Sequence, residues 1–228
     1  MVLGDYPAQG ERQLISEDWI TRARMKHDLY VAQHGDKPPG EVRGKMGLDV
    51  AEFGTDSNVA CIRYGSYITF SSWAGVDTYE SAVRSLTLYK QKNCEIAYID
   101  ATGLGSGVAP MMAREGREDD VRAVSVKVAS TPSVTFKIED GEFYQLRDQL
   151  WWILREWLRK DESAMLPNDG MLLEELRTPS YKKNLRGKIV IMNKDTMREK
   201  LKRSPDRAEA LALTFTPVER PKVISLSS

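Results

Sequence analysis

The chain has 228 residues, of which 41% are hydrophobic and 29% charged, which is enough for one well-cored domain and a modest extension. No apolar run approaches the roughly 18 residues of a membrane span, and the N-terminus lacks the charged-then-apolar pattern of a signal peptide. The 33 basic and 33 acidic residues cancel, so the overall charge gives no argument for a nucleic-acid partner.

The first 44 residues are predicted to form a lead-in arm before the main domain. Ser16 is placed to cap a helix over residues 17–31, because a serine oxygen accepts hydrogen bonds from first-turn N–H groups. The Gly- and Pro-containing run at residues 34–40 then stops regular structure. We therefore divide the chain into a linker or docking arm at residues 1–44, a main domain at residues 45–218 and a C-terminal tail at residues 219–228.

From Lys45 the pattern changes to short strands. Three runs rich in β-branched and aromatic residues come first, and Gly65-Ser66 between the last two suits a hairpin turn. Apolar residues at helical spacing then predict a helix, and an apolar run that ends in an acid predicts a buried central strand. The expected elements are strands at residues 46–51, 58–64 and 66–73, a helix at 78–92 and a strand at 95–100.

The second half of the main domain alternates helices and strands. Trp151 and Trp152 lie in an amphipathic helix and are expected in the core. Ser204 at a cap position and Pro205 in the first turn mark the start of the last helix. The expected elements are helices at residues 108–115 and 143–159, strands at 121–128 and 189–192, and a final helix from 204 onward. Antiparallel hairpins followed by parallel additions indicate an α/β fold with a ribonuclease H-like mixed sheet flanked by helices.

Three aspartates occupy positions that suit a metal site. Asp49 lies within an otherwise apolar strand, Asp100 ends the next buried strand, and Asp206 opens the last helix. A carboxylate in an apolar strand is costly unless it is compensated, and a divalent cation is a direct compensation. Oxygen-only ligands favour Mg²⁺ or Mn²⁺ over zinc. One or two such ions activate water and stabilise the leaving oxygen of a phosphodiester, so the pattern predicts a metal-dependent nuclease.

Each acid also has a structural explanation that the sequence leaves open. Asp49 could pair with an arginine, and Asp206 could stabilise the positive end of a helix dipole. Two weaker candidates for the same site are Asp56, which equally suits an Asx turn, and Glu209, one helical turn beyond Asp206. Two strand-borne acids together with an acid at a helix start favour the metal site.

Basic residues dominate the segment 182–203 although the whole chain is neutral. Residues 184–187 suit the turn of a hairpin whose second strand packs inward. The basic side chains gathered at its exposed tip would be Lys182, Lys183, Arg186 and Lys188. Phosphate contacts of this kind position DNA without reading its sequence. We expect these four residues to bind DNA, and the alternative is a solubilising basic loop.

The two cysteines, Cys61 and Cys94, lie in apolar stretches and lack the CxxC spacing of metal or redox motifs. They are interpreted as buried free thiols of a reducing compartment. Because the chain holds two Cys and two His in all, a zinc site is not expected.

Several segments, in their order along the chain, resemble the nuclease domain of tailed-bacteriophage terminase large subunits. The segments are 15–20 for the link from the motor domain, 47–51 with 53–57 for the first nuclease motif, 98–108 for the second, 146–152 for the helix after the central sheet, and 204–211 for the terminal motif. Together they span most of the chain. One departure is visible, since the usual second acid of the terminal motif is Asp and here it is Glu209.

The resemblance implies an endonuclease that cuts concatemeric viral double-stranded DNA, in which genomes are joined end to end, during genome packaging. It implies Asp49, Asp100 and Asp206 as the catalytic metal ligands. It also implies the portal and the small terminase subunit as partners, and the host-cell cytoplasm at the procapsid as the place of action. The chain contains no GxxxxGK[ST] phosphate loop, so we interpret it as an isolated C-terminal domain without the ATPase motor domain of the full-length protein.

Other functions remain open at this point. A transposase or junction resolvase of the same fold would use the same acids and metals on DNA of different geometry. A non-enzymatic DNA-gripping module of the packaging motor would carry the acids for structure alone. An actin-like ATPase or sugar kinase is set aside, because those folds need two such domains and the chain is too short. A plasmid-nicking assay with and without Mn²⁺ separates the enzymes from the gripping module.

Overall fold

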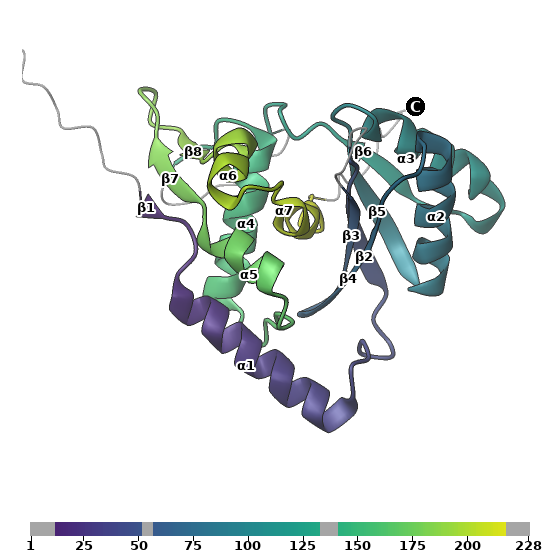
Figure 1. The fold of residues 1–228 in the computed structure, drawn as a ribbon, viewed down its shortest axis with the longest axis horizontal. Coiled ribbons are helices and arrows are strands. Elements are labelled where there is room, and N and C mark those ends of the chain that lie inside the picture. The colour runs from purple at the N-terminus through teal and green to yellow at the C-terminus, as the bar shows by residue number, and fades with distance from the viewer. Residues whose placement is uncertain (1–11, 52–56, 133–140, 218–228) are drawn as a thin grey trace, which may run out of the picture.

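The computed structural model describes residues 12–51, 57–132 and 141–217, in which a mixed sheet stands between two layers of helices (Figure 1). The strands of this sheet are β2 (Gly44–Asp49), β3 (Asn58–Tyr64), β4 (Tyr67–Trp73), β5 (Cys94–Asp100) and β6 (Ala123–Val126). Their order is β4-β3-β2-β5-β6. Strands β2, β3 and β4 pair antiparallel, whereas β5 joins β2, and β6 joins β5, in parallel. The predicted α/β fold with hairpins first and parallel strands later is confirmed.

Helices cover both faces of this sheet (Figure 1). One face is covered by α2 (Thr78–Gln91) and α3 (Gly105–Glu115). On the other face lies α7 (Asp206–Leu213), with α4 (Leu146–Lys160) packed behind it. Three further helices are α5 (Gly170–Arg177), α6 (Lys194–Leu201) and the 3-10 helix η1 (Arg117–Asp119).

Side chains alternate along each strand, so β2 serves both faces. Met46 and Leu48 are buried in the core under α2 and α3. Gly47 and Asp49 therefore face the opposite side, where α7 lies. The core on that side contains Trp151 and Trp152, both almost fully buried as predicted. The sheet thus leaves its α7 side free to carry polar groups at the strand ends.

The N-terminal segment packs onto the same core. Helix α1 (Glu17–His34) begins after Ser16, whose side chain accepts a hydrogen bond from the Asp18 N–H, so the predicted cap is confirmed. The residues that this segment contributes to the α7-side core are Leu14, Ile15, Ile20 and Ala23. The described part of the expected arm therefore helps to build the main core, and the division at residue 44 stays a prediction.

A second, smaller sheet carries the basic hairpin. Its strands, in the order β1-β7-β8, are β1 (Arg12–Gln13), β7 (Ser180–Lys183) and β8 (Ile189–Ile191). Strands β7 and β8 pair antiparallel. The Asn184 side chain closes the turn by accepting hydrogen bonds from the N–H groups of Arg186 and Lys188. The predicted turn at residues 184–187 is confirmed.

Each predicted helix and strand is found within three residues of its expected bounds, but β1, α5, α6 and η1 were not expected. The last helix also starts differently. Pro205 is its N-cap, and Ser204 makes no capping bond. Instead, the carboxylate of Glu175 on α5 accepts a hydrogen bond from the Ala208 N–H at 2.8 Å. The prediction that Ser204 caps this helix is wrong, because a buried acid from another element takes that donor.

Both cysteines are buried free thiols, as predicted. Among the described residues, no helix combines the length and the apolar character that a membrane crossing requires.

Candidate metal centre

Two neighbouring strands end in acids at the same edge of the sheet. Asp49 is the last residue of β2, and Asp100 is the last residue of β5. The two strands run parallel, with Leu48 opposite Ile99, so their carboxyl ends lie side by side. Asp49 is only 5% exposed, whereas Asp100 is partly exposed. Strand pairing alone therefore brings these two acids together.

Helix α7 carries the third predicted acid to the same edge. It crosses β2 at Gly47, where an added Cβ would lie 2.0 Å from the carbonyl oxygen of Ala210. A residue without a side chain is needed for so close an approach. Asp206 is the first residue of α7 and so projects toward the end of β2. The contact at Gly47 thus determines how near Asp206 comes to Asp49.

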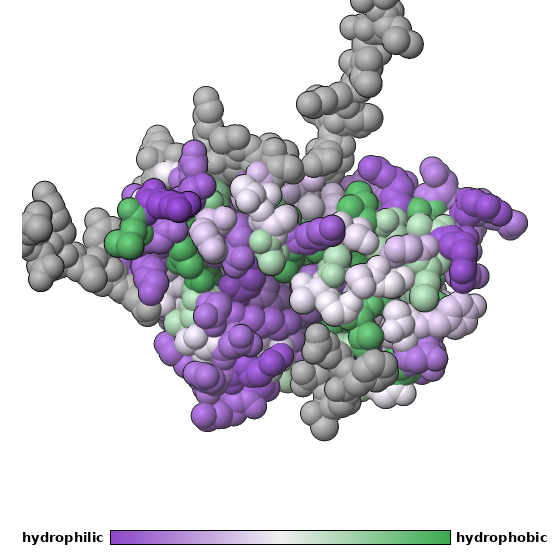
Figure 2. Space-filling view, turned by 90° about the horizontal axis from the view of Figure 1, so that it is seen from above, coloured by the Kyte–Doolittle hydropathy of each residue, from purple (hydrophilic) through white to green (hydrophobic). Residues whose placement is uncertain are grey.

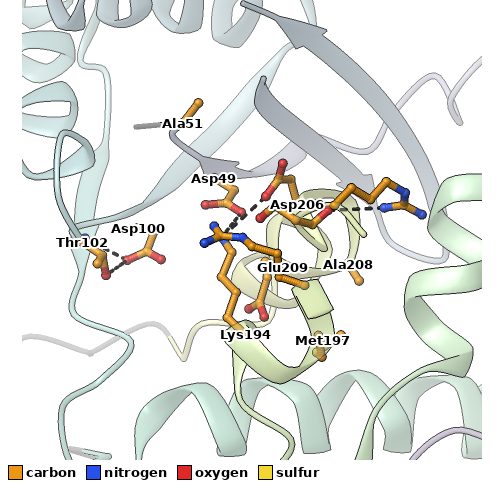
Figure 3. A network of polar contacts seen from close by, with 12 residues as sticks. Asp49, Ala51, Asp100, Thr102, Lys194, Met197, Asp206, Ala208 and Glu209 are labelled. Carbon is orange, nitrogen blue, oxygen red and sulfur yellow. Dashed lines mark hydrogen bonds and ion pairs between the residues drawn. The ribbon is translucent and has the colours of Figure 1, made fainter. Parts of the chain in front are cut away.

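A lysine occupies the space between two of these aspartates (Figure 3). The Nζ of Lys194 donates to Oδ2 of Asp49 at 2.8 Å and lies 3.6 Å from Oδ1 of Asp206. Lys194 is the first residue of α6, whose start is fixed by the side-chain cap of Asn193. Sequence reasoning counted Lys194 among the basic residues of segment 182–203 and missed its place in the site.

The three aspartates line one cavity of about 480 Å³. Its lining residues are Asp49, Val50, Ala51, Asp100, Thr102, Val128, Arg147, Lys194, Asp195, Arg198, Ser204, Asp206 and Glu209. The sheet edge supplies acids, and α6 supplies Lys194 and Arg198 on the other side. Within the described ranges, no three acidic, His or Cys side chains form a ready-made metal cluster. The ammonium of Lys194 lies between two of the candidates.

Burial makes two acids of this cavity, Asp49 and Asp100, reluctant to carry charge. It raises the pKa of Asp49 to about 7; the attraction of Lys194 opposes the rise, and the carboxylates of Asp206 and Glu209 add to it. Burial also raises the pKa of Asp100, against hydrogen bonds from its own loop. Burial lowers the pKa of Lys194, but its contact with Asp49 and the other two carboxylates outweigh this and raise it overall. The site therefore concentrates negative charge that a cation relieves.

The loop after β5 fixes the orientation of Asp100 (Figure 3). Its Oδ1 accepts hydrogen bonds from the Thr102 N–H at 3.0 Å and the Thr102 hydroxyl at 2.8 Å. Gly105, the first residue of α3, packs against the same loop, where an added Cβ would lie 2.0 Å from the carbonyl oxygen of Asp100. With one carboxylate oxygen held in place, the direction of the other is set as well.

The donor chemistry of the site fits an oxygen-liganded divalent cation. Asp49, Asp100 and Asp206 offer carboxylate oxygens alone, which Mg²⁺ and Mn²⁺ prefer. The Lys194 ammonium shows that a positive group is accommodated between two of them. The residues therefore fit the metal that the sequence predicts, provided that Lys194 gives up its contact with Asp49.

The two weaker candidates differ from these aspartates. Glu209 lines the cavity, but both of its carboxylate oxygens accept hydrogen bonds, one from Arg147 and the other from Trp151. Asp56 lies outside the described residues. The role of Arg147 was missed by sequence reasoning, since a lone arginine in an amphipathic helix carries no signal of a partner 62 residues away.

The basic hairpin stands apart from the cavity wall. Lys182, Lys183 and Arg186 are exposed, and the Nζ of Lys188 lies 3.2 Å from the Glu142 carboxylate. These four basic residues are described, and the cavity lining includes none of them. Their role in DNA binding stays a prediction.

The fold is similar to those of solved phage nuclease domains. The nuclease domain of the large terminase subunit gp2 of bacterial virus Sf6 matches at a TM-score of 0.72 and 22% identity, over 91% of this chain and 100% of that one. A mutant of that domain with manganese and beta-thujaplicinol matches at 0.74 and 22%, with the same coverage. The large terminase nuclease from thermophilic phage G20c with bound magnesium matches at 0.52 and 18%, over 78% of this chain and 82% of that one.

The other two comparisons find nothing similar: no protein-family model matches the chain, and no curated protein does. The structural matches show the fold, and the resemblance predicted from the sequence motifs is confirmed at that level.

Proposed function

We propose that this chain, which has the fold of terminase nuclease domains, is an endonuclease that cuts concatemeric viral double-stranded DNA during genome packaging. One observation carries the proposal: Asp49, Asp100 and Asp206 come from three separate elements to a single cavity, where a cationic side chain lies between two of them. The similar domains from Sf6 with manganese and from G20c with magnesium support the same assignment.

In this proposal, the three aspartates hold one or two Mg²⁺ or Mn²⁺ ions. Such ions, when bound, activate a water molecule and stabilise the leaving oxygen of the phosphodiester. Thr102 keeps Asp100 oriented through its two hydrogen bonds. Lys194 releases Asp49 as an ion enters, and its ammonium stays in the cavity wall, where it can neutralise a phosphate oxygen.

The DNA backbone would pass between the acidic sheet edge and the basic side of α6. Arg198 lines the cavity one helical turn beyond Lys194, and its side chain is 51% exposed. Figure 2 looks down on the molecule of Figure 1 from above, so horizontal positions agree between the two views. Hydrophilic side chains gather in Figure 2 at the horizontal position of α6 in Figure 1. The hairpin residues Lys182, Lys183 and Arg186 add positive charge further out. These groups supply affinity and register, not sequence recognition.

The wider setting is proposed from the resemblance of the sequence motifs. We infer that the chain works beside an ATPase motor domain of the same protein, with the portal and the small terminase subunit, at the procapsid in the host-cell cytoplasm. Cleavage itself would need no ATP, because a bound ion would supply an activated water molecule.

A plasmid-cleavage assay tests the proposal. The chain should nick supercoiled DNA with Mn²⁺ and without ATP, and Asp49→Asn or Asp100→Asn should slow cleavage on the order of a hundredfold or more, because each removes charge that holds the ions. Asp120→Asn is the matched control: Asp120 is exposed, and its left-handed φ of 52° suits asparagine.

Near-parental cleavage by Asp49→Asn and Asp100→Asn would refute the assignment of the site. A parent chain that binds DNA but never cuts it would be the non-enzymatic gripping module.

A further inference from the structure

Glu209 is a further carboxylate in the cavity wall beside the three candidate aspartates, and other side chains already hold both of its oxygens. Arg147 donates to Oε1 from Nε at 2.9 Å and from Nη2 at 2.6 Å. The indole N–H of Trp151 donates to Oε2 at 3.1 Å. The side chains of Arg147 and Glu209 are 8% and 11% exposed, so this pair is shielded from solvent. Glu209 is therefore engaged in a way that none of the three aspartates is.

Arg147 is itself fixed by further contacts. Its Nη1 donates to the Met192 carbonyl at 2.9 Å, and Nη2 lies 3.4 Å from the sulfur of Met197. Its guanidinium also lies 5.7 Å from the centre of the Trp151 ring. Because Met192 precedes α6 and Met197 belongs to it, Arg147 ties α4 to both α6 and α7. Glu209 cannot turn toward an ion without leaving a buried guanidinium unpaired, which is strongly destabilising.

The charge balance explains why the two side chains occur together. Arg147 places a positive charge in the wall of a cavity that we propose to bind divalent cations. Unpaired, that charge would repel an ion through a poorly screened interior. Glu209 cancels it at contact distance, so the pair adds no net charge to the cavity.

From these contacts we infer that Glu209 is a positioning residue, which neutralises and orients Arg147 and stays outside the metal ligand set. The ligand set is then Asp49, Asp100 and Asp206. This inference rests on the proposed function, since it states which of the carboxylates that line the cavity bind the ion. It is an alternative to the sequence-based suggestion that Glu209 adds a ligand one turn beyond Asp206.

Calorimetric titration with Mn²⁺ alone, without DNA, tests the inference. Glu209→Gln should weaken Mn²⁺ binding on the order of tenfold, because Arg147 is left charged and unpaired beside the site. The double variant Arg147→Met with Glu209→Gln removes both charges, and its Mn²⁺ affinity should return to within about threefold of the parent. If Glu209 coordinates the ion, removing Arg147 as well cannot restore a lost ligand, and both variants stay weak.

The double variant remains informative even if Glu209→Gln alone fails to fold. Replacing both members of a buried ion pair is far better tolerated than breaking it. Parental Mn²⁺ affinity in the folded double variant supports the positioning role, and a loss of tenfold or more overturns it. The rise in melting temperature on adding Mn²⁺ gives a second readout, which should be as large in the double variant as in the parent.

Asp100→Asn in the same titration separates this inference from the proposed function. If Asp100→Asn binds Mn²⁺ as tightly as the parent, the proposed metal site is wrong, and the role of Glu209 falls with it. If Asp100→Asn loses binding and the double variant loses it too, the metal site stands and Glu209 is a ligand. Loss in Asp100→Asn with retention in the double variant supports both.

Discussion

The ammonium of Lys194 lies between two carboxylates that would otherwise face each other across the cavity. It stabilises the charged form of Asp49 against burial. In the same position it competes with any ion that enters, because both need the same carboxylate oxygens. The residue therefore links the stability of the metal-free site to its affinity for metal.

Lys194→Ala should raise Mn²⁺ affinity by about tenfold, since it removes a competing positive charge next to the ligands. It should also lower the melting temperature without metal, because Asp49 and Asp206 lose their counter-charge. Titration and thermal unfolding with and without Mn²⁺ measure both effects. Lys200→Ala, on the exposed side of the same helix, is the control and should change neither. Weaker Mn²⁺ binding by Lys194→Ala would mean that the lysine helps to hold the ion.

Only part of the candidate site could be predicted from the sequence. Asp49 and Asp100 carried local signals, since each sits in an otherwise apolar strand. Asp206 carried one as an acid at the start of a predicted helix. Lys194 and Arg147 carried none, because their partners lie 145 and 62 residues away along the chain. Such contacts depend on how elements pack, which periodicity does not encode.

Among the elements, α7 is placed by two residues that it does not contain. Gly47 lets it approach β2, and the Glu175 carboxylate on α5 accepts a hydrogen bond from the Ala208 N–H in its first turn. Together they set the height of Asp206 above the end of β2. Both act at a distance from the cavity lining.

Gly47→Ala should cost about 1–3 kcal/mol or more in unfolding free energy, because its methyl group would overlap the backbone of Ala210. The displaced α7 should also weaken Mn²⁺ binding by moving Asp206. Gly40→Ala is the control, since an added Cβ there meets no atom within 4 Å. Denaturant titration measures the difference, and equal stability of the two variants would contradict the close approach.

Glu175 should make stability depend on pH. Burial raises its pKa from 4.5 to about 7, although the Ala208 N–H and Arg203 oppose the rise. A carboxyl whose pKa is higher in the folded state holds its proton more tightly there. Its stabilising effect is complete below 4.5 and is lost as the pH rises through 7.

The unfolding free energy of the parent should fall by up to about 3 kcal/mol as the pH rises from 4.5 to 7, and Glu175→Gln should remove this fall. Glu174→Gln is the control, because Glu174 also contacts Arg203 but its side chain is 58% exposed. Denaturant titrations across the interval measure both slopes. If the unfolding free energy of Glu175→Gln depends on pH as steeply as that of the parent, the Glu175 carboxyl does not titrate in this pH interval.

The sequence predicted the long elements and some short strands such as β6 and β8, but it missed β1, α5, α6 and η1. Helices α5 and α6 have eight residues each, about two turns, which is too short for a clear apolar period. Helix α6 is also mostly charged, so its sequence favours a solvated loop. The sequence therefore did not predict the wall of the cavity that α6 forms.

For the whole molecule, the sheet separates two cores and puts the acids at the edge of one of them. The order of hairpins and parallel strands was predictable because strand and helix signals alternate clearly along the chain. The packing of α1 against α4 and α5 was not, since nothing local marks a lead-in helix as part of a core. The same packing leaves the basic hairpin exposed on the outside of the smaller sheet.

Replacing Lys182, Lys183 and Arg186 together by alanine should weaken DNA binding and reduce its salt dependence by roughly one unit of slope per lost phosphate contact. Mn²⁺ binding should be unchanged, because these residues do not line the cavity. A control triple variant at exposed lysines elsewhere, Lys26, Lys37 and Lys160, removes the same charge. Equal loss in both would mean that net charge matters and not the hairpin.

We propose that three aspartates from β2, β5 and α7 hold a divalent ion. The most direct test is a crystal structure with Mn²⁺ in which anomalous scattering locates the metal. We predict manganese within about 2.0–2.3 Å of carboxylate oxygens of Asp49, Asp100 and Asp206, allowing for scatter around ordinary oxygen-ligand distances. The Lys194 ammonium should have left Asp49. Manganese bound elsewhere, or carboxylates that stay too far apart to share it, would show that these aspartates do not form the metal site.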